Sequence, residues 1–163
     1  MKVHIGRYPN KGERKISIKI DKWDTWGMDH TLSLIVVPML NQLKETKHGY
    51  PLTDPEDAPH IGEGKRENEY EFDDKAKERW DWIMDEMIWA HQQVVDESAE
   101  DQFHSGEIDL VSKEVDIDGQ KFYEMSHGPN HTHVFHKEEW EKWNERKRNG
   151  LKLFGKYYEN LWD

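Results

Sequence analysis

The 163-residue sequence contains no cysteine, which excludes a disulfide framework, a thiolate zinc site and a cysteine nucleophile. Hydrophobic residues make up only 34% of the chain, and no apolar stretch approaches the roughly 20 residues of a membrane-spanning helix. The opening residues, MKVHIGRY, lack the apolar centre of a signal peptide. We therefore expect no membrane partner and a cytoplasmic location.

Basic residues are also few, because 23 Lys and Arg stand against 34 Asp and Glu, for a net charge of −11. Affinity for nucleic-acid phosphates comes from clustered Lys and Arg, so this balance argues against general nucleic-acid binding. It is compatible with a basic protein partner, or with a small anionic ligand held in a locally basic pocket.

Aromatic residues offset the shortage of aliphatic ones. The chain has eight Trp, six Tyr and five Phe, each able to bury about 150–250 Å². Its length is typical of one domain. We therefore expect one folded domain over residues 1–163, not a disordered acidic chain.

Two short hairpins are predicted. Residues 2–8 and 15–21 have the alternating polar and apolar pattern of strands, and residues 9–12 between them have the composition of a turn. A second hairpin is predicted from strands at 108–115 and 121–125, around the turn signal Asp118-Gly119.

Three main helices are predicted, at about 30–47, at about 73–97, and from near His136 to the C-terminal region. An irregular loop at about 48–73, rich in proline, glycine and charge, separates the first two. The register of the last helix continues across Gly150, so we expect no break there. The predicted fold class is α+β, with three main helices, including a long C-terminal one, packed with short antiparallel β-hairpins.

The first helix has apolar residues on more than one side, which predicts a central helix buried nearly all round. Pro38 is expected to kink or split it, and Asp29 to serve as its N-cap. Its main apolar stripe consists of Leu32, Ile35, Val36, Met39, Leu40 and Leu43, with Leu34 and Val37 on the other side.

The second helix has an apolar face and an acidic face that also carries tryptophan. The first consists of Trp80, Met84, Met87, Ile88, His91 and Val95, and the second of Glu78, Asp81, Trp82, Asp85 and Trp89. We expect His91 to be a buried structural histidine. Tryptophans on an acidic face predict contact with another element, a partner subunit or a ligand, which favours a homo-oligomer.

Two segments are candidates for binding a small anionic ligand. One lies between a strand and a helix N-terminus, where free N–H groups can bind an anion, and it consists of Asp24, Thr25, Trp26, Asp29 and His30. Its two carboxylates and imidazole could also bind a metal or act as acid and base. A capping turn with packed tryptophans is the alternative. Arg79 and Trp82 offer a cation beside an aromatic ring for stacking a nucleotide, whereas Trp80 is expected in the core. The candidate ligand-binding residues are Trp26, Asp29, His30, Arg79 and Trp82.

Histidines cluster in SHGPNHTHVFH. If residues 131–133 are extended, His131 and His133 point to one side, and His136 could complete a three-nitrogen metal site. A polar loop that is merely rich in histidine is the alternative. No cofactor is expected otherwise, and a divalent metal is the one open possibility. Motifs of P-loop, Rossmann, serine-hydrolase and zincin enzymes are absent from the sequence.

Several blocks resemble a family of uncharacterised proteins encoded by T-even-like and marine tailed bacteriophages. They are KIDKWDTWGMDHTLSLIVVPMLNQLKETKHG, ERWDWIMDEMIWA, EDQFHSGEIDL, GPNHT and NGLKLFGKYYENLWD. With their spacing they cover most of residues 15–163. Members of that family have a longer segment containing Trp and Gly after an opening like MKVHIG, where this chain has only RYPNKGER. The resemblance implies a phage origin, and the cytoplasm of the infected bacterial host as the location, but no mechanism.

Three functional hypotheses follow. The first is a non-enzymatic phage accessory protein that binds a nucleotide-like ligand or a host factor, with a role in counter-defence. The second is a metal-dependent hydrolase that uses the His-rich segment. The third is an acidic mimic that docks on a basic nucleic-acid enzyme.

Overall fold

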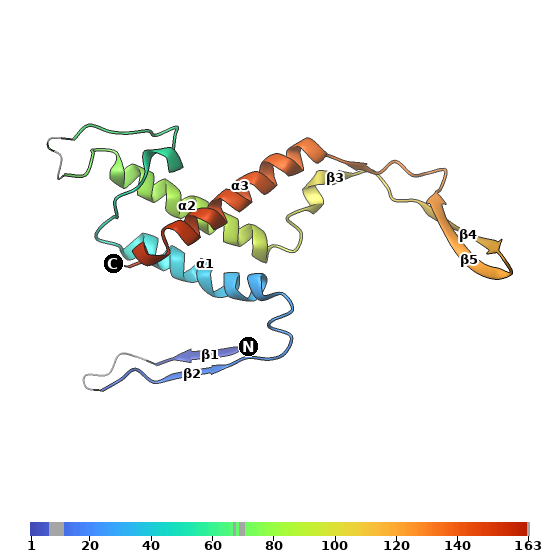
Figure 1. The fold of residues 1–163 in the computed structure, drawn as a ribbon, viewed down its shortest axis with the longest axis horizontal. Coiled ribbons are helices and arrows are strands. Elements are labelled where there is room, and N and C mark those ends of the chain that lie inside the picture. The colour runs from blue at the N-terminus through green and yellow to red at the C-terminus, as the bar shows by residue number, and fades with distance from the viewer. Residues whose placement is uncertain (7–11, 67, 69–70, 163) are drawn as a thin grey trace.

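The computed structural model describes residues 1–6, 12–66, 68 and 71–162. Within these residues the chain forms three α-helices: α1 (Met28–Thr46), α2 (Ala76–Val95) and α3 (Lys137–Lys156). Short antiparallel strand pairs accompany them, as Figure 1 shows. The predicted α+β class, with a long C-terminal helix, is confirmed.

The central helix is α2, which contacts α1 on one side and α3 on the other. The apolar face predicted for α2 is confirmed, because Trp80 and Ile88 are buried and His91 beside them is buried as well. The hydrophobic core consists of Leu40, Trp80, Ile83, Met84, Met87, Ile88, Leu153 and Tyr157.

The prediction that α1 is central and buried nearly all round is wrong. Only Ser33 and Leu40 are buried in this helix, and Met39 is 66% exposed. The reason is positional, since the main packing partner of α1 among the described elements is α2, and many of the remaining apolar residues of α1 face solvent. The helix is not split at Pro38, and it starts at Met28, which leaves Asp29 in the first turn rather than at the N-cap.

The second face of α2 is covered by other parts of the same chain. Trp89 lies against the guanidinium of Arg146 from α3, 3.9 Å from the ring centre, and Arg146 also makes two hydrogen bonds to Glu86, at 2.9 and 2.7 Å. Trp82 packs edge-on against His60, with 4.7 Å between the ring centres. This face therefore meets other elements of its own chain, and its tryptophans give no argument for an oligomer.

The α3 helix continues through Gly150, as predicted. A Cβ atom at this position would lie 2.4 Å from the backbone oxygen of Glu86 and 2.5 Å from the Cβ of Ala90. Glycine is therefore required there because α2 and α3 approach each other closely at this point.

The long loop between α1 and α2 is irregular apart from a short 3-10 turn at Pro55–Asp57. Its described part is held to the end of α3 by Tyr157. The hydroxyl of Tyr157 donates to Asp57 at 2.5 Å and accepts a hydrogen bond from the N–H of Asp54 at 3.0 Å. Residues more than ninety positions apart in the sequence thus fasten this loop to the helical body.

Both predicted hairpins are present. Strands β1 (Lys2–Ile5) and β2 (Ile16–Lys19) pair with each other, and most of their predicted turn lies outside the described residues. Strands β4 (Leu110–Ile117) and β5 (Gln120–His127) are joined by Asp118 and Gly119 at φ 56° and 80°. Two successive positive φ values are typical of a type I′ turn.

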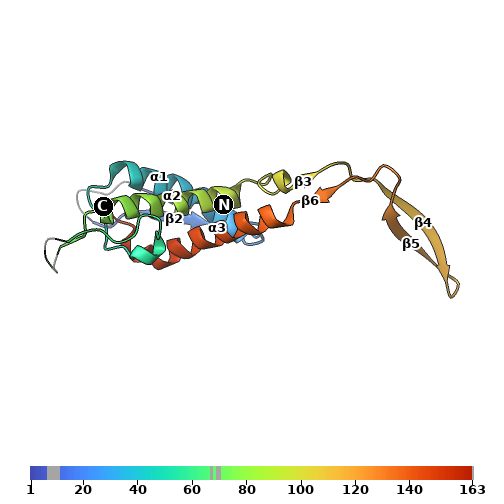
Figure 2. The ribbon, with the colours of Figure 1, turned by 90° about the horizontal axis from the view of Figure 1, so that it is seen from above.

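The molecule is elongated. The short strands β3 (His104–Ser105) and β6 (Val134–Phe135) pair to form a neck beyond the helical body. The β4–β5 hairpin projects from this neck as an arm, at the end far from the C-terminus in Figure 1, and Figure 2 confirms the separation from a second direction. The β1–β2 hairpin lies beside α1 (Figure 1).

Candidate functional site

The predicted ligand-binding residues do not converge. Lys47, at the end of α1, donates a 2.6 Å hydrogen bond to Asp81, near the start of α2, so the two helices run in opposite directions. The first residues of α1 and of α2 consequently lie at opposite ends of the helical body (Figure 1). Trp26 directly precedes α1 and Trp82 is near the start of α2, so the two residues are far apart.

Arg79 is fully buried, and every N–H group of its guanidinium donates to the protein. Nη1 and Nη2 bind the carboxylate of Asp73 at 2.8 and 2.5 Å, and Nε donates to the hydroxyl of Thr53 at 3.1 Å. The backbone oxygens of Gly62 and Thr53 accept the remaining donors. This arrangement makes Arg79 an anchor for the loop between α1 and α2, with no donor left for a ligand.

The segment before α1 is a turn, as the capping alternative predicted, but its tryptophans are not packed in the core. Trp26 is 86% exposed and lies 6.2 Å from the ring of Trp23. Asp24 accepts hydrogen bonds from the N-terminal amino group at 2.9 Å and from the N–H of Asp21 at 2.6 Å. These hydrogen bonds lower the pKa of Asp24. Asp29 is exposed and His30 is half-buried at the start of the helix.

The neck gathers histidines in pairs. Nδ1 of His104 and Nε2 of His133 are 2.9 Å apart, and the rings of His127 and His131 stack with centres 3.7 Å apart. His136 instead forms a 2.8 Å hydrogen bond with Ser105. Within the described part of the chain, no group of three or more His, Cys, Asp or Glu side chains could hold a metal ion. His131, His133 and His136 thus have three different partners.

His104 was not identified from the sequence as part of this cluster. It lies about thirty residues before His133, and only the pairing of His104 with Phe135 in the β3–β6 ladder brings the two histidines together. No local pattern in the sequence indicates that pairing.

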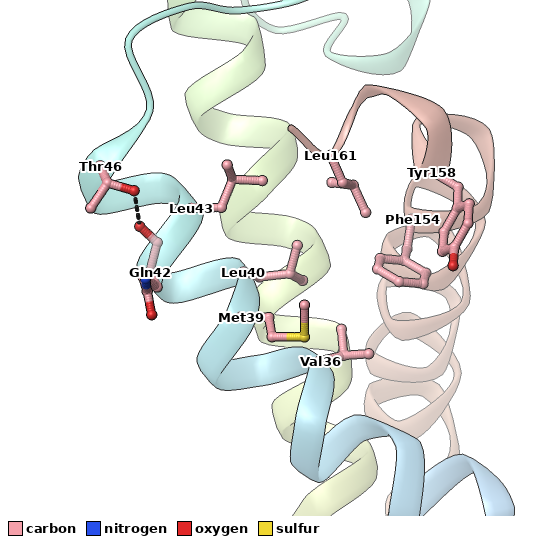
Figure 3. A pocket seen from close by; sticks show the side chains of 9 residues that line it. All are labelled: Val36, Met39, Leu40, Gln42, Leu43, Thr46, Phe154, Tyr158 and Leu161. Atoms are coloured by element: carbon pink, nitrogen blue, oxygen red, sulfur yellow. Dashed lines mark hydrogen bonds between the residues drawn. The ribbon is translucent and has the colours of Figure 1, made fainter. Parts of the chain in front are cut away.

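A groove of about 610 Å³ lies between α1 and the C-terminal end of α3, as Figure 3 shows. Its described lining contains no charged side chain and mostly apolar ones. Five of its residues, Leu40 from α1 among them, also pack in or against the hydrophobic core. The residues that line this α1–α3 groove are Val36, Met39, Leu40, Gln42, Leu43, Thr46, Phe154, Tyr158 and Leu161.

The β1–β2 hairpin has one apolar face and one polar face. Cross-strand partners point to the same side of a sheet, and the register pairs Val3 with Ile18 and Ile5 with Ile16. These four side chains, which we call the hairpin face, are between 40% and 61% exposed. The opposite face consists of Lys2, His4, Ser17 and Lys19.

The arm exposes apolar side chains on both of its faces. Val115 pairs with Phe122 on one face, and Glu114 pairs with Tyr123, which is 70% exposed, on the other. At the base of the arm, the N–H of Gly128 donates to the backbone oxygen of Asp109 at 2.9 Å. The apolar residues exposed along the arm are Leu110, Val111, Ile117, Phe122, Tyr123 and Met125.

The total accessible surface is large for a chain of this mass. It measures 12837 Å², whereas a compact monomer of 19.6 kDa is expected to have about 8,600 Å². The chain therefore exposes about 4,200 Å² more than a compact globule of the same mass, as expected for an elongated molecule. Surface of this kind is typical of a subunit that binds another molecule.

Comparison of the chain with protein-family models, with curated proteins and with solved structures finds no match. Among the described residues, no helix is both long and apolar enough to cross a membrane.

Proposed function

We propose that this chain is a bacteriophage accessory protein that acts without catalysis, by binding a host protein through its β4–β5 arm. The observation that carries the proposal is the arm itself, which projects from the helical body and exposes Phe122, Tyr123 and Met125 (Figure 2). A two-stranded hairpin alone is marginally stable in water, so contact with a partner would stabilise this one.

The chemistry of the arm indicates what kind of partner it fits. Among the described residues, each of its strands pairs only with the other, so the backbone groups on the outer edges can extend a sheet of another protein. The side chains of Val115 and Phe122 on one face would then fill apolar pockets of the partner, while the salt bridge between Lys121 and Glu114 at 2.8 Å stays at the rim.

A protein partner is favoured over the nucleotide-like ligand. The α1–α3 groove has the volume of a small-molecule site, but its described lining offers no cation for a phosphate, and the donors of Arg79 are all used within the protein. The metal-dependent hydrolase is less favoured as well, because His133 and His136 pair with different groups.

Site-specific photo-crosslinking tests the proposal. Benzoylphenylalanine is introduced at Tyr123 on the arm or, as a control, at the exposed Lys152 on α3, and each variant is produced in bacteria during infection. We expect a discrete crosslinked host protein from position 123 only. The purified host protein should then bind the whole chain and fail to bind a chain without the arm.

The arm can be removed with little disturbance. Asp109 and Gly128 are already joined by a backbone hydrogen bond, so a two-residue Asn-Gly turn can replace residues 110–127 between them. Circular dichroism should show the same helix content before and after this replacement. If position 123 gives no adduct, or if the host protein binds the armless chain as tightly, the proposal is wrong.

A further inference from the structure

We propose that the chain forms a symmetric homodimer in which the hairpin face of each copy occupies the α1–α3 groove of the other. This inference concerns surfaces other than the arm, so it does not depend on the proposed function. Two features of one chain carry it: an exposed apolar strand face and an apolar groove.

The two surfaces match in chemistry. The hairpin face presents only aliphatic side chains, those of Val3, Ile5, Ile16 and Ile18. The groove is lined mainly by aliphatic and aromatic side chains, and Met39 at its edge is two-thirds exposed. Burying both surfaces against each other removes apolar area from water at about 25 cal/mol for each Å².

The described residues of the same chain leave the hairpin face largely exposed. The amino group of Met1 is bound to Asp24, which ties the start of β1 to the turn before α1. In this position the hairpin lies beside α1 in Figure 1, yet Ile16 and Ile18 stay more than half exposed. Both side chains are therefore available to a second molecule.

Charge indicates that the second molecule is another copy of this chain. Residues 1–22 contain seven Lys and Arg against two Asp and Glu, whereas residues 23–163 contain sixteen against thirty-two. A basic hairpin is attracted to the acidic body of a second copy, while two hairpins stacked face to face would repel each other. The charge distribution thus favours the hairpin-to-body arrangement.

Reciprocal exchange gives a dimer with twofold symmetry. It buries two hairpin faces and two grooves, and such a closed arrangement leaves no unpaired copy of either surface.

Sedimentation equilibrium of the purified full chain tests the dimer. We expect a dimer at micromolar concentration, with a dissociation constant that increases with salt because the attraction is partly electrostatic. Ile18→Glu places a charge on the hairpin face and should raise the dissociation constant at least about a hundredfold. Ser17→Glu, on the polar face of the same strand, is the matched control and should leave the dimer intact.

A second pair of variants tests the groove. Met39 lines the groove, so Met39→Glu should dissociate the dimer. Leu34→Glu is its control, because Leu34 is also exposed, at 52%, but does not line the groove, and this variant should remain a dimer. All four positions are exposed, so circular dichroism should report unchanged folding. The armless chain should dimerise normally, which separates this result from the test of the arm.

Mixing the two weakened variants distinguishes exchange from other dimers. The groove is unaltered in Ile18→Glu, and the hairpin face is unaltered in Met39→Glu. An equimolar mixture should therefore form a heterodimer in which the hairpin face of the second variant occupies the groove of the first. A wild type that is a monomer at about a hundred micromolar, or a dimer that both variants leave unchanged, overturns the proposal. Native mass spectrometry also detects a bound apolar small molecule. A monomer that carries such a molecule would assign the groove to that ligand and would overturn the dimer proposal as well.

Discussion

His91 is a single residue whose environment makes the stability of the body depend on pH. It is buried between α1 and α3, where Ser33 hydrogen-bonds its Nδ1 at 2.9 Å and Phe154 packs edge-on against the ring. Its Nε2 has no partner among the described residues. Burial lowers the pKa of His91 below the ordinary value of 6.5, because the charged ring would lose its water.

The direction of the change in stability with pH follows from the difference in proton binding between the folded and the unfolded chain. As pH falls through about 6.5, His91 binds a proton in the unfolded chain but not in the folded one, so the native state loses stability. In His91→Leu this loss is absent. We expect the free energy of unfolding of the variant to improve relative to the wild type by up to about 1.4 kcal/mol for each pH unit below 6.5. Urea unfolding between pH 8 and pH 5 measures this difference, and parallel pH profiles would refute it.

Asp73 is the second residue with a definite consequence. Hydrogen bonds from Arg79 lower the pKa of its carboxyl group to about 2. The contribution of the pair is complete above the ordinary pKa near 3.8 and is lost as pH falls towards 2. Asp73→Asn leaves the guanidinium buried without a counter-charge and should cost about 3–5 kcal/mol in denaturant unfolding at pH 7.

Asp74→Asn is the matched control for Asp73→Asn. From the described part of the chain, its carboxylate accepts an exposed 2.9 Å hydrogen bond from the N–H of Lys65, which an asparagine oxygen can also accept. A change of less than about 1 kcal/mol is expected. Equal losses in the two variants would mean that the buried pair contributes no more than its exposed neighbour.

At the scale of an element, Gly150 determines how α3 packs on α2. Alanine in place of glycine normally stabilises a helix by about 1 kcal/mol. At Gly150 the sign should reverse, to a loss of about 1–3 kcal/mol, because the added methyl group would collide with Glu86 and Ala90. Gly155→Ala, later in the same helix and with nothing within 4 Å, should give the ordinary gain. Thermal unfolding of the two variants compares them directly, and a gain at both positions would contradict the close approach.

Elements defined by local chemistry were predictable. The Asp118-Gly119 turn indicated the arm, and the apolar register of the last helix indicated its passage through Gly150. The sequence did not predict how many other helices or strands each element packs against. The stripe on α1 showed that its residues are apolar, but not which of them α2 covers. The α1–α3 groove was therefore missed, although four of its nine lining residues belong to that stripe.

The candidate site was predictable only where its parts are local. Trp82 was placed correctly on the charged face of α2, but its partner His60 comes from a loop with no periodic pattern. Arg79 was assigned to a ligand because the sequence does not show that Asp73 and Thr53 enclose it. Contacts between segments with no regular pattern depend on the tertiary structure, and sequence periodicity carries no information about them.

At the scale of the whole molecule, the arm determines the overall dimensions. A compact chain of 163 residues has a radius of gyration of about 15 Å. Small-angle X-ray scattering should give a clearly larger radius of gyration for each subunit. Replacement of residues 110–127 by a two-residue turn should shorten the maximum dimension more than the small loss of mass accounts for. An unchanged maximum dimension would mean that the arm folds back on the body in solution.

The attachment of the first long loop by Tyr157 also has a consequence for synthesis. The strands, the loop and α2 all leave the ribosome before Tyr157 does, yet the loop has no other described link to the end of the chain than Asp54 and Asp57. During translation Arg79 can hold the loop as soon as α2 has folded, whereas the attachment at Asp54 and Asp57 forms only after Tyr157 has left the ribosome. A chain without Tyr157 would therefore keep the attachment of the loop to α2 and lose its attachment to the end of α3.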